Sequence, residues 1–339
     1  MYNKNVYKYD AWKRREHMAV RETVGWYYWT HQLLEVTGPD AAASLDKIYA
    51  NPIANLCVGR ERYTTMLNEQ AEIIDDVVVF RLEEEKFWVS TLFLKKLVRW
   101  LDAHKGDAKV SYRDVTPEYD MYAVQGPKSK EMVNAIVDTP VDDLKFFSFA
   151  ANTVDGVPVL VNRAGFTGEK FGYEIYIAPN QQEMLEGKLK AAAARFGGEQ
   201  VTDFQIMAWT LPTEKGFYYM RDLMHTNPIE VGLDRNIGWN KEFIGKEALL
   251  KIKEKGIDHV MVGFTMEEAD VRIQGKDLGG PGAPVYVGDE EIGRVSKCDF
   301  SFVLDKVIGY IYAEAGKVSE GDSVTIRGAE AKICKTVFI

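Results

Sequence analysis

The stretch RYTTMLNEQAEIIDDVVVFRL, residues 62–82, sets the folding pattern of the first part of the chain. It is typical of two strands joined by a polar connection, and KFWVSTL at 86–92 continues it as a third strand. Asp75 and Asp76 stand side by side before the apolar run VVVF. Because neighbouring residues of a strand point to opposite faces, one carboxylate can face solvent while the other faces the interior. A strand end, or a pair with an arginine, would explain both residues without a function.

The segments that follow alternate strands with helices. KKLVRWLDAHK at 95–105, KSKEMVNAIV at 128–137 and QQEMLEGKLKAAAARFG at 181–197 are predicted helices, with strand-like runs at 121–127, 153–166 and 173–179 between them. Such runs favour an α+β fold with antiparallel sheets over a doubly wound parallel sheet. From His259 onward, short strands separated by Gly and Asp turns are typical of a small β-barrel. We therefore predict an α+β body over residues 1–250 and a barrel domain over 259–339.

Composition narrows the classes of partner. The chain has 339 residues, 46% of them hydrophobic, and 42 Lys plus Arg against 51 Asp plus Glu give a net charge of -9. This balance disfavours nucleic acid as the main partner. We expect a cytoplasmic protein with no membrane partner, because the first residues contain no apolar signal segment and no stretch reaches the roughly 18 apolar residues of a membrane span.

The cysteines and histidines give no metal signature. The three cysteines are far apart in the sequence, and no two of the five histidines have the spacing of a helical metal site. We therefore expect no metal site and no disulfide framework.

Six blocks of sequence carry a family likeness: EHMAVRE at 16–22, VTGPDA at 36–41, residues 62–82, YAVQGP at 122–127, RAGFTGEKFGYEIYI at 163–177 and NPIEVGLDRNIGWNKEFIGKEAL at 227–249. In order and spacing they resemble the folate-dependent aminomethyltransferases of the glycine-cleavage T-protein family, which includes tetrahydrofolate-dependent demethylases. The resemblance implies two interleaved ferredoxin-like units in the body, which with the barrel form a three-domain cloverleaf around a central folate channel. It also implies tetrahydrofolate as the cofactor.

The resemblance implies roles for particular side chains. It places Asp76 close to N5 and N10 of the folate, where a carboxylate can orient the amine and stabilise the positive charge that grows on it. It implies that Glu174 binds the pterin, because a carboxylate can accept hydrogen bonds from the N–H and the amino group of that ring together. Arg163, Phe166 and Tyr173 are further expected folate contacts, with Phe166 standing where the family usually has tyrosine.

The aromatic segment GWYYWTHQ at 25–32 is the most unusual part of the chain. Four consecutive rings put aromatic groups on both faces of a strand, so the segment either packs in the core or lines a donor pocket. If it lines a pocket, Tyr28 or His31 can protonate the leaving atom. Glu230, in a proline-containing loop, is a further candidate for folate or substrate contact.

Departures from the family pattern separate the possible functions. Tyr28 stands about where aminomethyltransferases carry Asp, Pro212 replaces an Arg near Glu214, and an Asn after the third strand is missing. These changes favour a one-carbon transferase of the demethylase type, moving a methyl or aminomethyl group from a small-molecule donor to N5 of tetrahydrofolate. The alternatives are a glycine-cleavage aminomethyltransferase acting on a lipoyl carrier protein, a folate-binding protein without catalysis, and a scaffold that does not bind folate.

Overall fold

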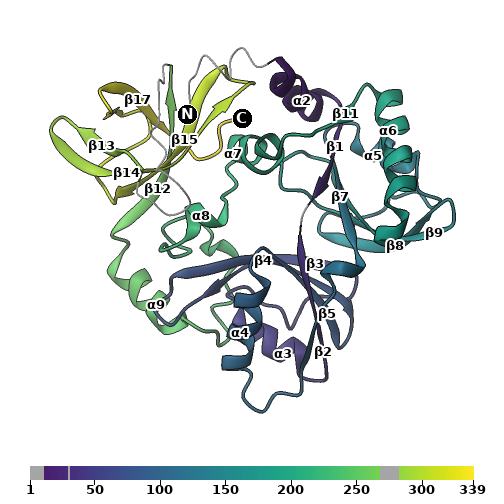
Figure 1. Ribbon diagram of the computed structural model, residues 1–339. Coiled ribbons are helices and arrows are strands. Elements are labelled where there is room, and N and C mark those ends of the chain that lie inside the picture. Colours follow the sequence, from purple (N-terminus) through teal and green to yellow (C-terminus); the bar gives the residue numbers. More distant parts are fainter. Residues whose placement is uncertain (1–10, 30, 268–281) are drawn as a thin grey trace.

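Two sheets organise residues 11–29, 31–267 and 282–339, which the computed structural model describes (Figure 1). The larger sheet has eleven strands in the order β11-β1-β7-β10-β9-β8-β3-β4-β5-β2-β6 within the described part of the chain. Its strands are β1 (Gly25–Trp29), β2 (Gln32–Thr37), β3 (Arg60–Leu67), β4 (Ile73–Glu83), β5 (Lys86–Thr91), β6 (Ser111–Asp114), β7 (Asp120–Gln125), β8 (Ser148–Val154), β9 (Val157–Arg163), β10 (Gly172–Ile177) and β11 (Glu199–Gln200). Every pairing is antiparallel except that of β1 with β11.

The second sheet is a closed barrel in the order β12-β15-β14-β13-β16-β17. Its described strands are β12 (His259–Met266), β13 (Pro284–Val287), β14 (Glu290–Ser301), β15 (Lys306–Glu314), β16 (Ser323–Ile326) and β17 (Ala329–Cys334). The prediction of an α+β fold with a C-terminal β-barrel is confirmed. The two strands expected within 62–82 are β3 and β4, and the third is β5.

Helices cover one face of the large sheet and connect it to the barrel. The described α-helices are α2 (Ala11–Glu22), α3 (Ala41–Ile48), α4 (Leu94–His104), α5 (Ser129–Asn134), α6 (Gln182–Phe196), α7 (Leu211–Glu214), α8 (Met220–Leu223) and α9 (Lys246–Lys255), with a π-helical turn η3 (Ile206–Thr210) before α7. Short 3₁₀ turns are η1 (Thr116–Glu118), η2 (Pro179–Gln181) and η4 (Asp234–Asn236). Among the described residues, no helix is long and apolar enough to cross a membrane.

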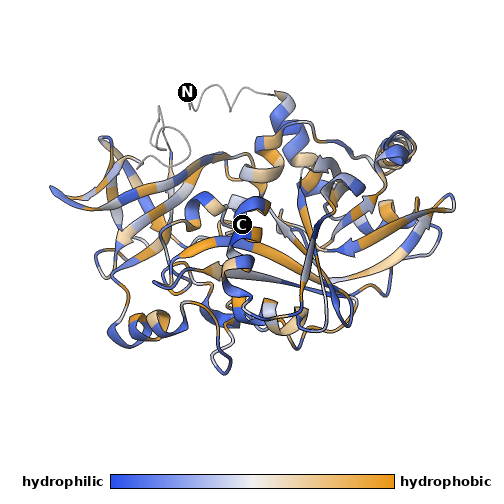
Figure 2. Ribbon diagram, turned by 60° about the horizontal axis from the view of Figure 1, so that its bottom comes forward, coloured by the Kyte–Doolittle hydropathy of each residue, from blue (hydrophilic) through white to orange (hydrophobic). Residues whose placement is uncertain are grey.

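Each half of the large sheet has its own hydrophobic core. Helices α3 and α4 pack on the half made by β2 to β5, through residues such as Leu45 and Leu97. Helices α5 and α6 pack on the half that contains β1, β7, β9 and β10, through residues such as Met132 and Leu189. In Figure 2 the strands at the centre are largely orange, because both faces of the sheet are partly covered. We call the face opposite these four helices the central face.

The two halves meet at a narrow seam between β3 and β8. Only Arg60 and Ser148 pair there as ladder partners among the described strands. Two backbone hydrogen bonds beside them, from the Glu61 amide to the Phe147 carbonyl and from the Phe149 amide to the Gly59 carbonyl, extend the contact. On the central face the seam is covered by an apolar cluster that includes Phe80 of β4 and Tyr176 of β10, with ring centroids 5.9 Å apart.

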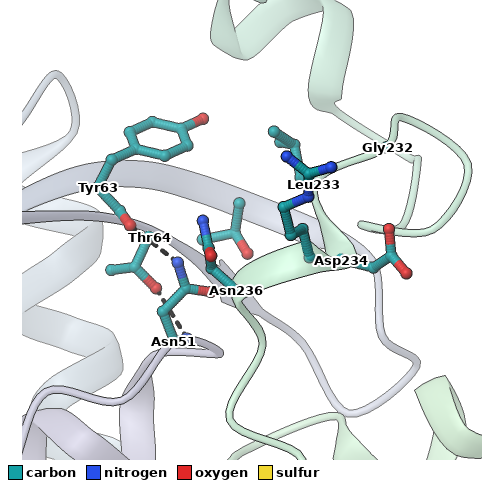
Figure 3. Close-up of a pocket in the computed structure, with 9 residues that line it drawn as sticks. Asn51, Tyr63, Thr64, Gly232, Leu233, Asp234 and Asn236 are labelled. Carbon is teal, nitrogen blue, oxygen red and sulfur yellow. Dashed lines mark hydrogen bonds between the residues drawn. The ribbon is translucent and has the colours of Figure 1, made fainter.

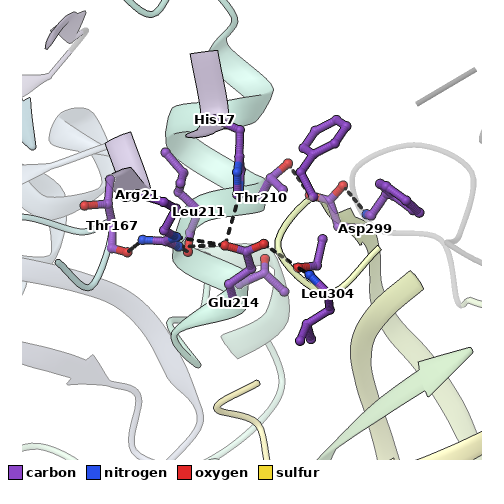
Figure 4. A network of polar contacts seen from close by, with 12 residues as sticks. His17, Arg21, Thr167, Thr210, Leu211, Glu214, Asp299 and Leu304 are labelled. Carbon is purple, nitrogen blue, oxygen red and sulfur yellow. Dashed lines mark hydrogen bonds and ion pairs between the residues drawn. The ribbon is translucent and has the colours of Figure 1, made fainter. Parts of the chain in front are cut away.

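A buried carboxylate joins the N-terminal helix, the connecting helices and the barrel (Figure 4). Glu214 of α7 is fully buried, and its Oε2 accepts hydrogen bonds from His17 Nε2 at 3.0 Å and Arg21 Nε at 2.9 Å. Its Oε1 accepts one from Ser301 Oγ of β14 at 2.5 Å. Burial alone would raise the pKa of Glu214, but its contacts with His17, Arg21 and Ser301 lower it below its usual value. The carboxylate is therefore held ionised where three segments meet.

We predict that Glu214→Ala destabilises the protein by about 3–5 kcal/mol, because the buried Arg21 guanidinium keeps only Glu169 as a carboxylate partner, and His17 and Ser301 lose their shared acceptor. Chemical denaturation followed by circular dichroism measures the loss. Glu84→Ala is the matched control: Glu84 also pairs with an arginine, at 2.8 Å, but its side chain is 82% exposed. That substitution is expected to cost at most about 1 kcal/mol. Equal losses for the two variants would contradict the central role given to Glu214.

Candidate functional site

The adjacent carboxylates of β4 point to opposite faces of the sheet, as strand alternation predicts. Asp75 is 1% exposed and lies on the face that α3 and α4 cover, in step with Val77 and Val79. Its Oδ2 accepts a hydrogen bond from Thr91 Oγ1 at 2.7 Å, and its Oδ1 accepts one from the Asp76 amide at 3.0 Å. Asp76 is less buried and faces the central face. Asp75 is thus the interior member of the pair.

Asp76 sits in surroundings that favour its protonated form. Its Oδ2 accepts a hydrogen bond from the Tyr63 hydroxyl of β3 at 3.0 Å. Burial raises its pKa to about 6, the Tyr63 hydrogen bond acts against this, and repulsion by Asp222 adds to it. A carboxyl group with such a pKa can hold a proton or release it close to neutral pH.

Further polar side chains line the same central face. Residues paired directly across antiparallel strands share a face, and Glu61 pairs with Phe80 while Asn162 pairs with Glu174. Asn162 Nδ2 donates to Glu61 Oε2 at 2.8 Å and to Glu174 Oε2 at 3.0 Å. The Tyr176 hydroxyl donates to the same Glu174 oxygen at 3.2 Å. Strands β3, β9 and β10 therefore bring two carboxylates and one amide together.

A second pair of charges lies where α8 meets the barrel, and one of them acts on Asp76. Asp222 of α8 is 3% exposed, and Ser296 Oγ donates to its Oδ1 at 3.0 Å. Lys297 of β14 is 1% exposed; its Nζ lies 3.8 Å from Asp222 Oδ2 and 5.0 Å from the ring centroid of Trp209. Burial lowers the pKa of Lys297, and the charge of Asp222 opposes this. Since Asp222 also raises the pKa of Asp76, the barrel contact acts electrostatically on the central face.

A cavity of about 430 Å³ lies beside this part of β3 (Figure 3). Asn51 is held in place beside the cavity, because its Nδ2 donates a hydrogen bond to the Tyr63 carbonyl at 2.9 Å and its backbone N–H donates one to Thr64 Oγ1 at 3.1 Å. Thr65, the ladder partner of Asp76, also lines it. The cavity is lined by Asn51, Tyr63, Thr64, Thr65, Gly232, Leu233, Asp234, Arg235 and Asn236. A ligand in this cavity would contact Tyr63, whose hydroxyl donates a hydrogen bond to Asp76.

The aromatic segment divides between the two faces of β1. Trp26 belongs to the core under α5 and α6, and Tyr28 lies on the same face, 40% exposed. The Tyr28 hydroxyl donates to Asp120 Oδ1 at 2.8 Å, and burial with this hydrogen bond raises its pKa to about 12. Tyr27 and Trp29 lie on the central side of the sheet. The structure thus places Tyr28 on the face opposite Asp76 and Glu174.

His31 lies just before β2 and is 6% exposed. Its ring is 5.6 Å from that of Tyr176, whose hydroxyl contacts Glu174. Its Nε2 is buried and has no hydrogen-bond partner within the described part of the chain. Burial lowers the pKa of His31, which favours the neutral ring and makes it a weaker proton donor than a solvent-exposed histidine. His31 borders the central face, and its role as an acid stays a prediction.

Of the expected folate contacts, Glu174 and Phe166 lie toward the central side. Phe166 packs against Trp29, with ring centroids 4.3 Å apart. Tyr173 is fully buried in the core under α5 and α6, on the face opposite Glu174. Arg163 Nη1 donates to the Leu144 carbonyl at 2.8 Å, and its guanidinium lies over Phe171. The structure therefore does not bring Tyr173 and Arg163 together with Glu174.

Glu230 is engaged at the edge of the barrel. It is 8% exposed, and its Oε2 accepts hydrogen bonds from the Tyr312 hydroxyl at 2.8 Å and the Asn227 amide at 3.0 Å. The Met261 amide of β12 donates to the Glu230 carbonyl at 2.9 Å. These contacts attach the loop to the barrel, so Glu230 has a structural role at this position.

Sequence reasoning missed several polar residues that the structure gathers here: Glu61, Asn162, Asp222 and Lys297. One signal was available, since Lys297 and Asp299 alternate with Cys298 and Phe300 of the barrel core, which puts two charged residues side by side on the other face of β14. The other three become visible only when the contacts between distant segments are known. Among the described residues, no group of three or more His, Cys, Asp or Glu side chains has the arrangement of a metal site.

Comparisons with known proteins cover nearly the whole chain. Residues 1–241 match the family model described as the GCVT N-terminal domain, and residues 260–339 match the glycine cleavage T-protein C-terminal barrel domain. An aminomethyltransferase of Halothermothrix orenii is 32% identical over 338 residues, covering 96% of this chain and 90% of the relative. One from Streptomyces avermitilis is 33% identical, covering 94% and 86%. The crystal structure of the glycine cleavage system aminomethyltransferase T from Bartonella henselae has the same fold, with a TM-score of 0.83 at 24% identity, covering 96% of this chain and 89% of that one.

We predict that stability falls as pH rises from about 5 to 8, because folding favours the protonated forms of carboxyl groups whose folded pKa is raised. Burial raises the pKa of Asp75 from its usual 3.8 to about 7, so between these values the folded state keeps a proton that the unfolded state has released, and stability falls as pH rises. Asp75→Asn should flatten this dependence when melting temperatures are compared at the two pH values. Asp102→Asn is the control, because Asp102 is half exposed on α4 and should leave the slope unchanged. A slope in Asp75→Asn equal to that of the wild type would contradict the assignment.

Proposed function

Since the chain belongs to the glycine-cleavage T-protein family and is an enzyme of the aminomethyltransferase type, we propose that it transfers a one-carbon unit from an aminomethyl donor to tetrahydrofolate. The observation that carries the proposal is the position of Asp76: a half-buried carboxyl group with a pKa of about 6, on the same sheet face as Glu174. Curated relatives named aminomethyltransferase favour aminomethyl transfer over the demethylase interpretation. Family membership likewise disfavours a folate-binding protein without catalysis.

The polar atoms of the central face fit a pterin. Glu61 Oε1 and Asn162 Oδ1 are buried acceptors that have no hydrogen-bond partner in the described residues. Together with Glu174 they form a set that accepts hydrogen bonds, and a pterin edge presents adjacent N–H and amino donors. We propose that these residues hold the ring, and that the two halves of the large sheet are the ferredoxin-like units of a three-domain cloverleaf with its folate channel at the central face.

The chain's own groups then have separate tasks. When bound, tetrahydrofolate supplies the nitrogen that receives the one-carbon unit. Asp76 orients that amine, stabilises positive charge beside it and can take up a proton at its carboxylate, while Tyr63 fixes the orientation of the carboxylate. Burial strengthens this charge stabilisation relative to water. The charge of Asp222, which lies beside Lys297, acts on Asp76 by raising its pKa.

We propose the lipoyl arm of a carrier protein as the donor, with free small molecules as the alternative. The aromatic run, which favoured a small-molecule pocket, puts Tyr28 on the other face of the sheet. Incubation of the protein and tetrahydrofolate with aminomethylated lipoyl carrier protein, methoxy-aromatics, methylated amines or sulfonium compounds distinguishes the two. Methylene-tetrahydrofolate and ammonia from the carrier alone are expected; 5-methyl-tetrahydrofolate from a small donor would instead establish a demethylase.

We predict that Asp76→Asn keeps folate binding but lowers turnover by about a hundredfold or more, since it removes a preorganised charge. Product formation by mass spectrometry and folate affinity by calorimetry separate the two effects. Asp102→Asn, the same substitution on exposed α4, should behave as the wild type. Unchanged turnover in Asp76→Asn would remove this residue from the mechanism.

Glu174→Ala should weaken tetrahydrofolate binding by about 2 kcal/mol or more, because donors of the pterin would be left unpaired. Glu186→Ala is the control: Glu186 accepts a hydrogen bond from the Tyr122 hydroxyl at 2.9 Å on the helix-covered face of the same sheet. Wild-type affinity in Glu174→Ala would show that the pterin is held elsewhere.

A further inference from the structure

Glu61 and Glu174 face one another across a single amide. The two hydrogen atoms of Asn162 Nδ2 are both used, one toward each carboxylate, at 2.8 and 3.0 Å. Glu61 comes from β3, in the half of the sheet under α3 and α4, whereas Glu174 comes from β10 in the other half. The amide therefore bridges two acidic groups that the seam of the sheet brings together.

The cluster is buried but incomplete. Glu61 is 3% exposed and Asn162 is fully buried. Their remaining oxygens, Glu61 Oε1 and Asn162 Oδ1, have no hydrogen-bond partner within the described part of the chain. Leaving a buried polar atom without a partner costs about 1–3 kcal/mol, so two such atoms in one place indicate that something else satisfies them. Glu174, by contrast, is partly exposed and gives the cluster an open side.

Little positive charge opposes these carboxylates. Arg60, the neighbour of Glu61 on β3, provides some attraction, and the Tyr176 hydroxyl and the Asn162 amide provide hydrogen bonds. Burial and the charge of Glu174 raise the pKa of Glu61 well above its usual value, and burial raises that of Glu174. Two neighbouring carboxylates with so little positive charge beside them cannot both ionise cheaply, so the pair titrates as a unit.

We infer that Glu61 and Glu174 share one proton in the free protein, and that a planar ring with adjacent N–H donors displaces this proton on binding, with Glu61 becoming a second acceptor through Oε1. The O–H bond of one carboxylic acid breaks, the proton passes to the buffer, and the N–H groups of the ring replace it as hydrogen-bond donors. Asn162 contributes its free Oδ1 as the third acceptor. The inference rests on the proposed function, because it takes the pterin of tetrahydrofolate as that ring.

Glu61 would then be a determinant of ligand specificity. A ring that lacks its exocyclic amino group has fewer hydrogen-bond donors. It therefore cannot satisfy the second carboxylate once that group has lost its proton. Discrimination of this kind is strong, because the unpaired groups belong to the protein and stay buried. Glu61→Gln keeps the size of the side chain and one acceptor oxygen for Asn162, but it carries no shared proton and presents an N–H where the free oxygen lay.

The test is isothermal titration of the full-length protein with reduced tetrahydrofolate at pH 7, in buffers with different enthalpies of ionisation. The wild type should release about one proton for each ligand bound. Glu61→Gln should release close to none and bind about tenfold more weakly. A 2-desamino analogue should bind the wild type much more weakly than tetrahydrofolate, and Glu61→Gln should lose most of that preference.

Glu186→Gln is the matched control, because the Glu186 carboxylate accepts a hydrogen bond from a tyrosine hydroxyl on the other face of the sheet. This variant should leave proton release unchanged. Binding by the wild type without proton release would overturn the inference and leave the proposed function standing. Equal release by wild type and Glu61→Gln would assign the proton to another group, such as Asp76, and would also overturn it. Absence of tetrahydrofolate binding in the wild type would overturn both. The wild-type measurement does not depend on the folding of any variant.

Discussion

The carboxylate of Glu214 is the constraint on which the arrangement of body and barrel depends. It is fully buried, and its partners His17, Arg21 and Ser301 come from α2 and β14, on either side of α7. A buried charge tolerates little rearrangement, because each partner that is lost weakens its compensation in a medium of low dielectric. The same helix leads into α8, where Asp222 meets Lys297 of the barrel. Fixing α7 therefore fixes the charges that act on Asp76.

The central face depends in turn on how the two halves of the large sheet are joined. Asp76 and Tyr63 belong to the half under α3 and α4, and Glu174 and Asn162 belong to the other. Neither half alone contains both the proposed proton-handling carboxylate and the proposed ring-binding group. Apolar contact between Phe80 and Tyr176 holds the halves in register on this face, and the polar side chains surround that contact. The packing and the proposed chemistry are thus organised around the same seam.

Strand alternation made part of this site predictable from sequence. It separates Asp75 from Asp76, and the same rule applied to YEIYI puts Tyr173 and Glu174 on opposite faces, so the sequence alone could have separated these two residues. Glu61 and Asn162 could not be found this way. They lie 101 residues apart, and nothing in either segment specifies that β3 and β9 share a face beside β10. Likewise, the aromatic run predicts rings on both faces of a strand but not which face carries the ligand.

The narrowness of the β3 to β8 seam has a mechanical consequence. One ladder pair and two flanking backbone hydrogen bonds join two half-sheets that each have their own core. Such a junction is more compliant than the ladders on either side of it, because few bonds must stretch for the halves to tilt. A rigid ring bound by both Glu61 and Glu174 would link the two halves across this seam, so that ligand binding would stiffen the sheet. The distance between the two halves, and with it the placement of Asp76, would then be set by the occupant as well as by the protein.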